Sequence, residues 1–290
     1  METILEMRNV SKNFADFSLK HVHITLKRGY IMGFIGPNGA GKSTTIKLLM
    51  NLVKKDSGEI RIFGLDSEKH DVKIKERIGF VYEENHFYEE LTVQEMKNMI
   101  RPFYSQWDEG LFAKYVRDFN LPLTKPIKQL SKGMKMKFAL AVALSHNAEL
   151  LILDEPTSGL DPLVRSELLE ILQTVIEEGD KSVFFSTHIT SDLDKIADFI
   201  TVIHKGEILL SKTKDELLDE YCIVKGGKET LMKIDRALLH GLKENAFGFE
   251  ALALRKQMKP YGDSLLIEKP TLEDIMLFTI RGGETRVSSY

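Results

Sequence analysis

The sequence predicts an α/β protein built on a largely parallel β-sheet with helices on both faces. Short, wholly apolar runs recur along the chain, as in strands that are buried on both sides. Segments with the apolar spacing of helices alternate with these runs. A glycine-rich loop follows the run at 31–35, and two acidic residues follow the run at 150–153. Since open α/β sheets bind ligands at the carboxyl ends of their strands, both loops are expected at one ligand site.

Hydrophobic periodicity places the individual elements. An antiparallel layer is expected from the strands at 4–14, 22–26 and 58–63. Strands of the buried sheet are expected at 31–35, 78–82, 150–153, 183–186 and 200–203. Helices are expected at 42–51, 92–103, 108–119, after 131, and at 162–178, 192–197 and 215–220.

Composition narrows the class of protein. A length of 290 residues suits one large domain with an appendage. The 40 basic and 43 acidic residues give a formal charge of −3, so no nucleic-acid partner is expected. The single Cys222 leaves no internal disulfide and suits a reducing compartment. The first residues lack signal-peptide features, and no run approaches the roughly 18 apolar residues of a spanning helix. We therefore expect a cytoplasmic protein that does not insert into the membrane.

Residues 36–44 read GPNGAGKST and fill each fixed place of the phosphate-binding loop pattern G-x-x-x-x-G-K-[ST]. The glycines let consecutive N–H groups turn toward phosphate oxygens, beside the positive end of the next helix. Lys42 is expected to reach the β- and γ-phosphates, and Ser43 to ligate Mg²⁺. A plain glycine-rich turn is disfavoured by these two residues. The pattern indicates a P-loop NTPase core. Nucleotide binding is assigned to Asn38, Gly39, Ala40, Gly41, Lys42, Ser43 and Thr44.

Asp154 and Glu155 end the apolar run at 150–153. Because adjacent strand residues face opposite sides, the two carboxylates are expected to have different roles. Asp154 is assigned to the Mg²⁺ shell, and Glu155 to the general base that polarises the attacking water. The alternative, an acidic strand end without chemistry, is the less favoured interpretation beside a phosphate loop.

A third motif, LSKGM at 130–134, precedes a segment of helical spacing. Taken alone, it predicts an amphipathic helix with a serine cap. SGLD at 158–161 and STH at 186–188 follow in the chain. With these motifs in this order, residues 3 to about 220 resemble the ATP-binding subunits of ABC transporters.

That resemblance implies ATP as the nucleotide and a composite site. Ser131 and Gly133 would close over the γ-phosphate held by a second ATP-binding subunit, although Lys132 and Met134 depart from the family's LSGGQ. His188 matches the switch histidine that stabilises γ-phosphate charge. Phe14 is placed where an aromatic ring stacks on adenine, with Phe17 as the alternative.

The strand at 78–82 resembles the one before the family's Q-loop, but Glu83 holds the glutamine position. The family's glutamine touches Mg²⁺ and links the site to the membrane subunits, and a carboxylate also offers oxygen to Mg²⁺. Alternatively the alignment is one residue out, and Glu83 and Glu84 are both solvated. The stretch 83–90 is expected to face the membrane partner through Phe87 and Tyr88, with ordinary burial as the alternative.

The resemblance divides the chain into an ATP-binding domain at 1–221, with a helical subdomain at about 85–146, and an accessory domain at 222–290. In the accessory domain we expect a strand at 264–268, a helix capped by Thr271 and Asp274, and a frayed tail from Gly282 onward. A dimer contact, a regulatory lid and plain packing are all open roles for it, and packing is favoured.

The expected function is an ATP-hydrolysing subunit on the inner face of the cell membrane, paired with a transmembrane permease and a second ATP-binding subunit, identical or related. Residues 270–276 and the Glu83 loop resemble exporters of the bacitracin-resistance and phenol-soluble modulin type, which implies export of a peptide or another amphipathic toxic substrate. The alternative is a mechanical ATPase of a membrane signalling or remodelling complex. No long heptad segment or second phosphate loop supports a chromosome-maintenance ATPase or a duplicated translation factor. A kinase or GTPase would not need the Ser131 and His188 motifs.

Overall fold

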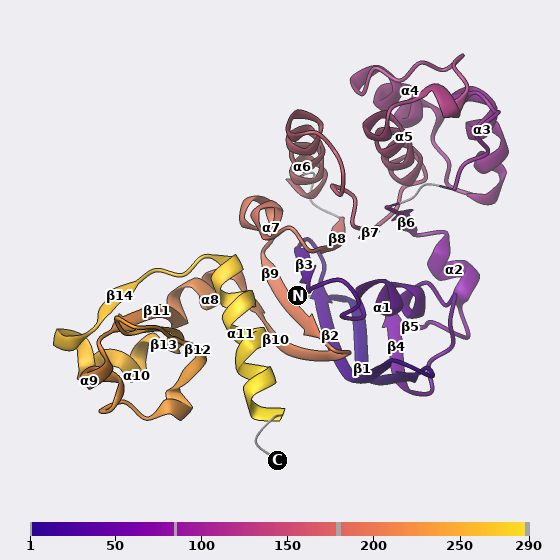
Figure 1. Ribbon diagram of the computed structural model, residues 1–290. Coiled ribbons are helices and arrows are strands. Elements are labelled where there is room, and N and C mark those ends of the chain that lie inside the picture. Colours follow the sequence, from indigo (N-terminus) through magenta and orange to yellow (C-terminus); the bar gives the residue numbers. More distant parts are fainter. Residues whose placement is uncertain (1, 84–85, 178–180, 288–290) are drawn as a thin grey trace.

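The computed structural model describes residues 2–83, 86–177 and 181–287, and in these ranges the strands form three β-sheets (Figure 1). The strands are β1 (Thr3–Asn13), β2 (Ser18–Lys27), β3 (Ile31–Ile35), β4 (Ser57–Ile62), β5 (Leu65–Asp66), β6 (Ile78–Val81), β7 (Leu150–Asp154), β8 (Ser182–Thr187), β9 (Phe199–His204), β10 (Glu207–Thr213), β11 (Tyr221–Gly226), β12 (Leu239–Glu244), β13 (Phe249–Leu254) and β14 (Leu266–Glu268). The helices are α1 (Lys42–Leu49), α2 (Asp71–Lys75), α3 (Val93–Ile100), α4 (Glu109–Asp118), α5 (Lys132–Leu144), α6 (Pro162–Glu177), α7 (Thr190–Ile196), α8 (Lys214–Glu220), α9 (Lys228–Leu231), α10 (Arg255–Met258) and α11 (Leu272–Val287).

The central sheet has the strand order β10-β9-β3-β8-β7-β6, and only its edge strand β10 is antiparallel to its neighbour. The predicted α/β class is therefore confirmed. Strands β3, β7 and β8 are buried along their whole length, which explains their unbroken apolar runs. In register, Ile35 lies beside Thr187 and Asp154 beside Ser186. The loops after these three strands therefore meet at one edge of the sheet.

The predicted antiparallel layer is present, with the order β2-β1-β4-β5. Its inner face packs with Phe34 of β3 and Phe184 of β8 in one core cluster. Strand β1 ends at Asn13, so Phe14 lies just beyond the strand in which it was expected. Periodicity missed β5 and α2, because elements this short carry too few residues to show a period.

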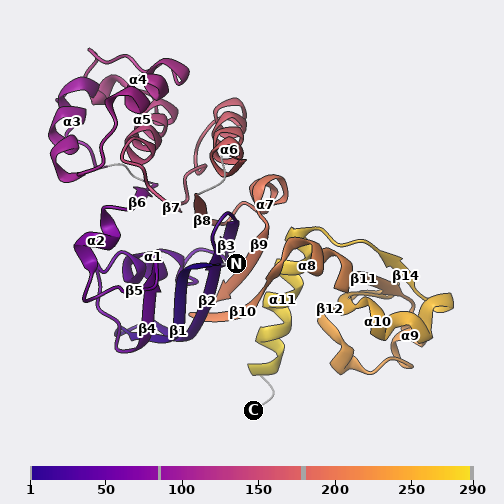
Figure 2. The same ribbon diagram turned by 180° about the vertical axis from the view of Figure 1, so that it is seen from behind.

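The predicted helical subdomain contains α3, α4 and α5 and projects from the sheet at the end opposite the accessory domain (Figures 1 and 2). Thr92 and Glu95 form a reciprocal capping box at the start of α3. Ser131 caps α5, where its Oγ accepts the N–H of Met134 at 3.2 Å. Glu178, the last residue expected in α6, is outside the described residues.

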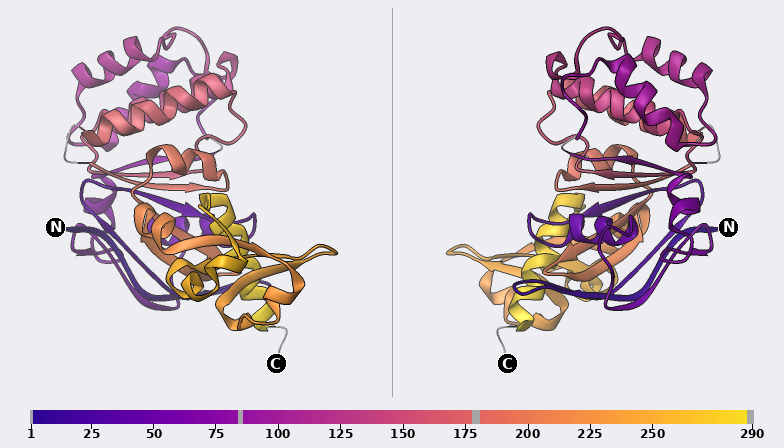
Figure 3. Two further views of the ribbon diagram at one scale, coloured as in Figure 1. Left: turned by 90° about the vertical axis from the view of Figure 1, so that its left-hand side faces the viewer. Right: turned by 90° about the vertical axis from the view of Figure 1, so that its right-hand side faces the viewer.

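The accessory segment forms a second antiparallel sheet of order β12-β13-β11-β14, and α11 lies between this sheet and the central one (Figures 1 and 2). Seen from the sides, the helical subdomain and the accessory strands lie at opposite ends of the molecule (Figure 3). The predicted cap is confirmed, since Thr271 N–H donates to Asp274 at 3.0 Å and Asp274 N–H to Thr271 at 3.1 Å. The predicted fraying from Gly282 is wrong, because α11 continues to Val287. Glycine suits this position, since a Cβ on Gly282 would lie 3.1 Å from the backbone nitrogen of Gly241.

Helix α11 packs into the large core that surrounds the central sheet. Leu272, Ile275 and Phe278 are buried in the same cluster as Leu193 and Ile196 of α7. The accessory sheet also has a small core of its own around Val224 and Phe249. Within the described ranges, the helices are all too short or too polar to cross a membrane.

Candidate active site

The phosphate loop connects β3 to α1, and its glycines are sterically required. A Cβ on Gly36 would lie 2.3 Å from the carbonyl oxygen of Ile203, and one on Gly41 would lie 2.8 Å from Phe17 Cζ. Gly39 and Gly41 also have φ values of 77° and 114°, which favour glycine. The loop thus curls tightly into the first turn of α1, whose free N–H groups attract anions.

An open cavity of about 910 Å³ lies over this loop. Ten residues predicted for the site line it: Phe14, Asn38, Gly39, Gly41, Lys42, Ser43, Thr44, Glu83, Glu155 and His188. Ala40 lies behind the loop, buried, and its N–H donates to the Pro37 carbonyl at 3.1 Å. Asp154 is also buried, at the floor of the site. A volume of this order accommodates a nucleotide triphosphate.

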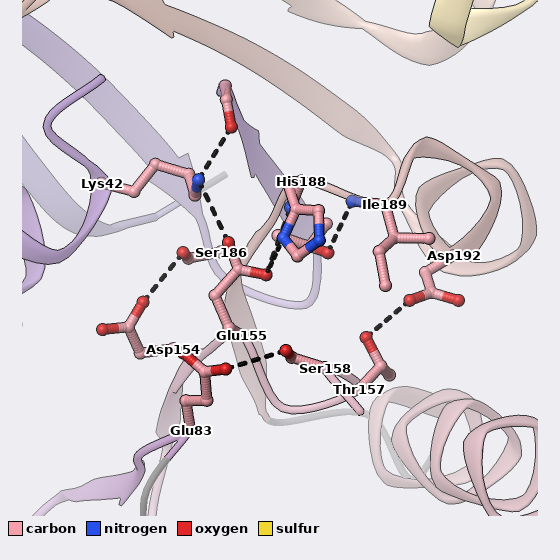
Figure 4. Close-up of polar contacts among 12 residues, drawn as sticks. Lys42, Glu83, Asp154, Glu155, Thr157, Ser158, Ser186, His188, Ile189 and Asp192 are labelled. Atoms are coloured by element: carbon pink, nitrogen blue, oxygen red, sulfur yellow. Dashed lines mark hydrogen bonds and ion pairs between the residues drawn. The ribbon is translucent and has the colours of Figure 1, made fainter. Parts of the chain in front are cut away.

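Lys42 is buried, and its ammonium group has two close partners (Figure 4). Nζ donates to the carbonyl oxygen of Gly36 at 2.7 Å and lies 3.1 Å from Glu155 Oε1. In a buried site this ion pair offsets the cost of desolvating both charges. Phosphate oxygens are the natural competitor for Glu155 at the same ammonium.

Asp154 accepts a hydrogen bond from Ser186 Oγ at 3.0 Å. Burial raises the pKa of Asp154, and hydrogen bonds from Ser186 and Ser43 oppose the rise. The structure therefore brings together the carboxylate and the hydroxyl that the sequence assigned to Mg²⁺. Both are hard oxygen donors and fit the coordination that Mg²⁺ prefers, with phosphate oxygens and water as further ligands.

Glu155 connects Lys42 to His188. Its Oε2 lies 2.8 Å from His188 Nδ1 and accepts the His188 backbone N–H at 3.2 Å. Asp154 and Glu155 thus have different partners, as expected, but for another reason than strand alternation. Strand β7 ends at Asp154, and Glu155 takes a left-handed conformation with φ 50° that turns its side chain toward Lys42 and His188.

Glu83 is half-buried, and its Oε1 accepts the hydroxyl of Ser158 at 2.8 Å. Since it also lines the cavity, it faces the site and is not simply solvated. Glu84, which that alternative also expected to be solvated, lies outside the described residues. Ser158 belongs to the SGLD motif, so this hydrogen bond joins the Q-loop position to the loop that follows Glu155.

The two aromatic candidates for the adenine platform occupy different positions. Phe14 is 46% exposed at the lip of the cavity, with Lys12 Nζ 5.7 Å from its ring centroid. Phe17 is half-buried against the core, with its ring wedged beside Gly41. Both rings line the cavity, and the more exposed Phe14 is the more accessible to a base, so the geometry favours Phe14.

Ser131 and Gly133 lie apart from this constellation. Among the described residues, neither lines the cavity over the phosphate loop. Ser131 is exposed at the start of α5, whereas Gly133 is buried, and a Cβ there would lie 2.7 Å from Val164 of α6. Lys132 Nζ lies beside Gly159 of the SGLD motif. At the start of α5, Ser131 is therefore exposed while Gly133 is covered by α6.

In the stretch 83–90, the two aromatic residues expected to face the membrane partner differ in their surroundings. Phe87 packs on Phe138 with ring centroids 4.8 Å apart, which is ordinary burial. Tyr88 is 62% exposed and is free to contact a partner.

Sequence reasoning assigned no role to several polar residues that hold the site together. They are Ser158, which binds Glu83, Ser186, which binds Asp154, and Thr157 and Asp192, which bind each other. The usable signal was the polar residue at the end of a buried strand, which the parallel register sets opposite Asp154.

Comparison with known proteins places these features in a family. A family model described as ABC transporter matches residues 19–158. The bacitracin transport ATP-binding protein BcrA of Bacillus licheniformis is 37% identical over 217 residues, covering 72% of this chain and 69% of that protein. The lantibiotic transport ATP-binding protein SrtF of Streptococcus pyogenes is 35% identical over 73% of this chain and 92% of its own.

Solved structures agree. The ATP-binding subunit of an ABC transporter superposes with a TM-score of 0.67 and 30% identity, covering 74% of this chain and 91% of that one. The cbiO1 protein of Clostridium perfringens, part of an ABC transporter complex, gives a TM-score of 0.66 and 26% identity over 75% and 91% of the two chains. The chain belongs to the ABC transporter family, as an ATP-binding subunit that hydrolyses ATP.

Proposed function

We propose that this chain is the motor subunit of a membrane exporter for amphipathic peptides. ATP hydrolysis is supported by the contacts of Glu155 with Lys42 and His188 beside the phosphate loop. The cargo proposal rests on relatives whose names specify bacitracin and lantibiotic transport. A separate transmembrane permease would supply the path, with this chain on its cytoplasmic face. Tyr88 is an exposed aromatic anchor for that contact.

Each site residue has a chemical role in this proposal. Lys42 leaves Glu155 and binds the β- and γ-phosphates, which frees the carboxylate to polarise the attacking water. His188 donates toward the γ-phosphate as negative charge builds. Ser43 and Asp154, with Glu83 nearby, would hold Mg²⁺, which neutralises charge on the phosphate oxygens when it is bound. Phe14 would stack on the adenine.

The second half of the site would come from a second ATP-binding subunit. Ser131 is exposed and absent from the described lining of its own cavity, which supports an action across an interface. A hydroxyl, a glycine N–H and a helix N-terminus together suit a γ-phosphate. The pair of ATP-binding subunits would close over ATP and open after hydrolysis, and this movement would be passed to the permease. ATP can drive the closure because it binds the closed pair more tightly than the open pair.

The cargo proposal is tested by reconstitution. The chain is produced with the membrane protein encoded beside its gene, and the pair is placed in lipid vesicles with bacitracin as the probe. MgATP should drive bacitracin across the membrane, and bacitracin should stimulate phosphate release several-fold. A matched pair carrying Lys42→Ala should do neither. ATP hydrolysis that neither responds to bacitracin nor to other cationic peptides, and moves none of them, would favour a mechanical role in a membrane complex.

A second prediction concerns Glu83. Glu83→Gln restores the family's residue and removes one negative charge from a site that already holds Asp154 and Glu155. We expect MgATP affinity to be kept or improved, and the Mg²⁺ concentration for half-maximal hydrolysis to rise several-fold. The measurement is phosphate release against Mg²⁺ concentration at saturating ATP. An unchanged Mg²⁺ dependence, with and without the permease, would contradict a role for Glu83 in metal binding.

A further inference from the structure

Helix α7 carries a buried carboxylate that the proposed mechanism does not use. Asp192 is fully buried, and each of its carboxylate oxygens has a partner. Thr157 Oγ1 donates to Oδ2 at 2.7 Å, and Arg165 Nε donates to Oδ1 at 2.5 Å. Figure 4 shows the Thr157 contact beside the catalytic cluster. A buried ionised carboxylate is costly unless it is paired in this way, so its position is strongly determined.

Asp192 and its two partners come from three separate parts of the site. Thr157 lies two residues after Glu155, in the loop that leaves β7. Arg165 lies in the first turn of α6, the helix that begins directly after the SGLD motif. It also donates to Ser191 Oγ at 2.8 Å. Asp192 lies four residues after His188, on the helix that this histidine precedes. The Asp192 carboxylate therefore ties the segment of the general base to the segment of the switch histidine.

This tie matters because the geometry of Glu155 is demanding. Glu155 has a left-handed backbone conformation, with φ 50°, which is unfavourable for a residue that carries a Cβ. One carboxylate must nevertheless reach Lys42 on one side and His188 on the other. A strained backbone of this kind persists only where the surrounding structure holds it in place. Thr157, two residues after Glu155, is anchored by a buried hydrogen bond to Asp192.

We propose that Asp192 is a positioning residue for ATP hydrolysis, which acts through Thr157 to hold Glu155 in register with His188. The inference rests on the roles proposed above for Glu155 and His188. Among the described residues, Asp192 is not part of the lining of the cavity over the phosphate loop. Its loss should therefore slow the chemical step and leave the nucleotide affinity almost unchanged, because small displacements of a general base are costly to the rate.

The test uses Thr157→Val and Asp192→Leu, which keep the number and branching of the side-chain heavy atoms but cannot form the hydrogen bond, and the double variant. Binding-competent sites are counted by titration with the MgATP analogue AMP-PNP, and phosphate release is expressed per competent site. We expect each single variant to lower kcat per site about tenfold, with KM for ATP within twofold of wild type. The double variant should also be about tenfold slower, since both changes break the same link.

Glu167→Gln is the matched control, because Glu167 of α6 forms its ion pair with Lys137 of α5 and not with a residue of α7. It should leave kcat per site within twofold. A purely structural role would instead reduce the number of competent sites and leave the rate of each site normal, and that result would overturn the proposal, as would multiplying effects in the double variant. If Glu155→Gln itself remained active, the proposed catalytic roles would fail first. If it is inactive and the Thr157 variant turns over normally, only the positioning role fails.

Discussion

Glu155→Gln should lower ATP turnover by about 10²–10³-fold while MgATP affinity is kept or increased. An amide has the shape of the carboxylate but cannot accept a proton from water, and a positioned general base contributes about 10²–10⁴-fold to a rate. The substitution also removes the anion that lies 3.1 Å from Lys42 Nζ, so the ammonium is freer to bind phosphate. Steady-state phosphate release and the Kd for MgATP are the two measurements.

Glu207→Gln is a suitable control for this result. Glu207 pairs with Lys20 on the surface, where both side chains are about half exposed, so its loss should leave turnover within twofold. If Glu155→Gln hydrolysed ATP within tenfold of wild type, another group would be the base, and the assignment of Glu155 would be wrong.

Between pH 7 and pH 4.5, the His146→Phe variant should lose about 2 kcal/mol less unfolding free energy than the wild type. Burial lowers the pKa of His146 from 6.5 to about 4, and its ring stacks on Tyr104 with the centroids 3.8 Å apart. Between those two pKa values the unfolded chain binds a proton that the folded chain excludes. Stability is therefore lost as the pH falls from about 6.5 toward about 4, at up to about 1.4 kcal/mol per pH unit.

Phenylalanine keeps a flat ring against Tyr104 but has no site for the proton. Urea unfolding of both proteins at pH 7 and pH 4.5 gives the comparison, since carboxylates common to both contribute equally and cancel in the difference. An equal loss of unfolding free energy in the two proteins would show that His146 is protonated in the folded state. At pH 7 the variant should be as stable as wild type to within about 1.5 kcal/mol, because the volumes are similar.

The parallel sheet and its phosphate loop could be predicted because their signals are local. A strand buried on both faces reads as a continuous apolar run, and the glycines at 36, 39 and 41 are needed wherever such a loop forms. The C-terminal sheet was mostly missed, since its strands β11, β12 and β13 gain their core from residues far apart in the chain. No local pattern reveals that Gly282 lets α11 pass close to β12.

The candidate site divides in the same way. Residues that act through fixed motifs, such as Lys42 and Asp154, were found from their spacing. The left-handed turn at Glu155 and the Thr157–Asp192 contact depend on where β8 and α7 place their ends, which is a tertiary property. Strand alternation correctly predicted that Asp154 and Glu155 have different partners. The cause is the left-handed backbone of Glu155, which lies after the end of β7.

In the proposed mechanism, Ser131 and Gly133 of a second copy or a related subunit complete the ATP site. The mass of the Glu155→Gln chain in solution, measured by light scattering after gel filtration with and without MgATP, tests it most directly. We expect a species of twice the chain mass with MgATP and of single mass without it, and a return to single mass when Ser131→Arg is added. A chain that binds MgATP tightly yet remains at single mass, alone and with its permease and any co-purifying ATP-binding subunit, would contradict the composite site.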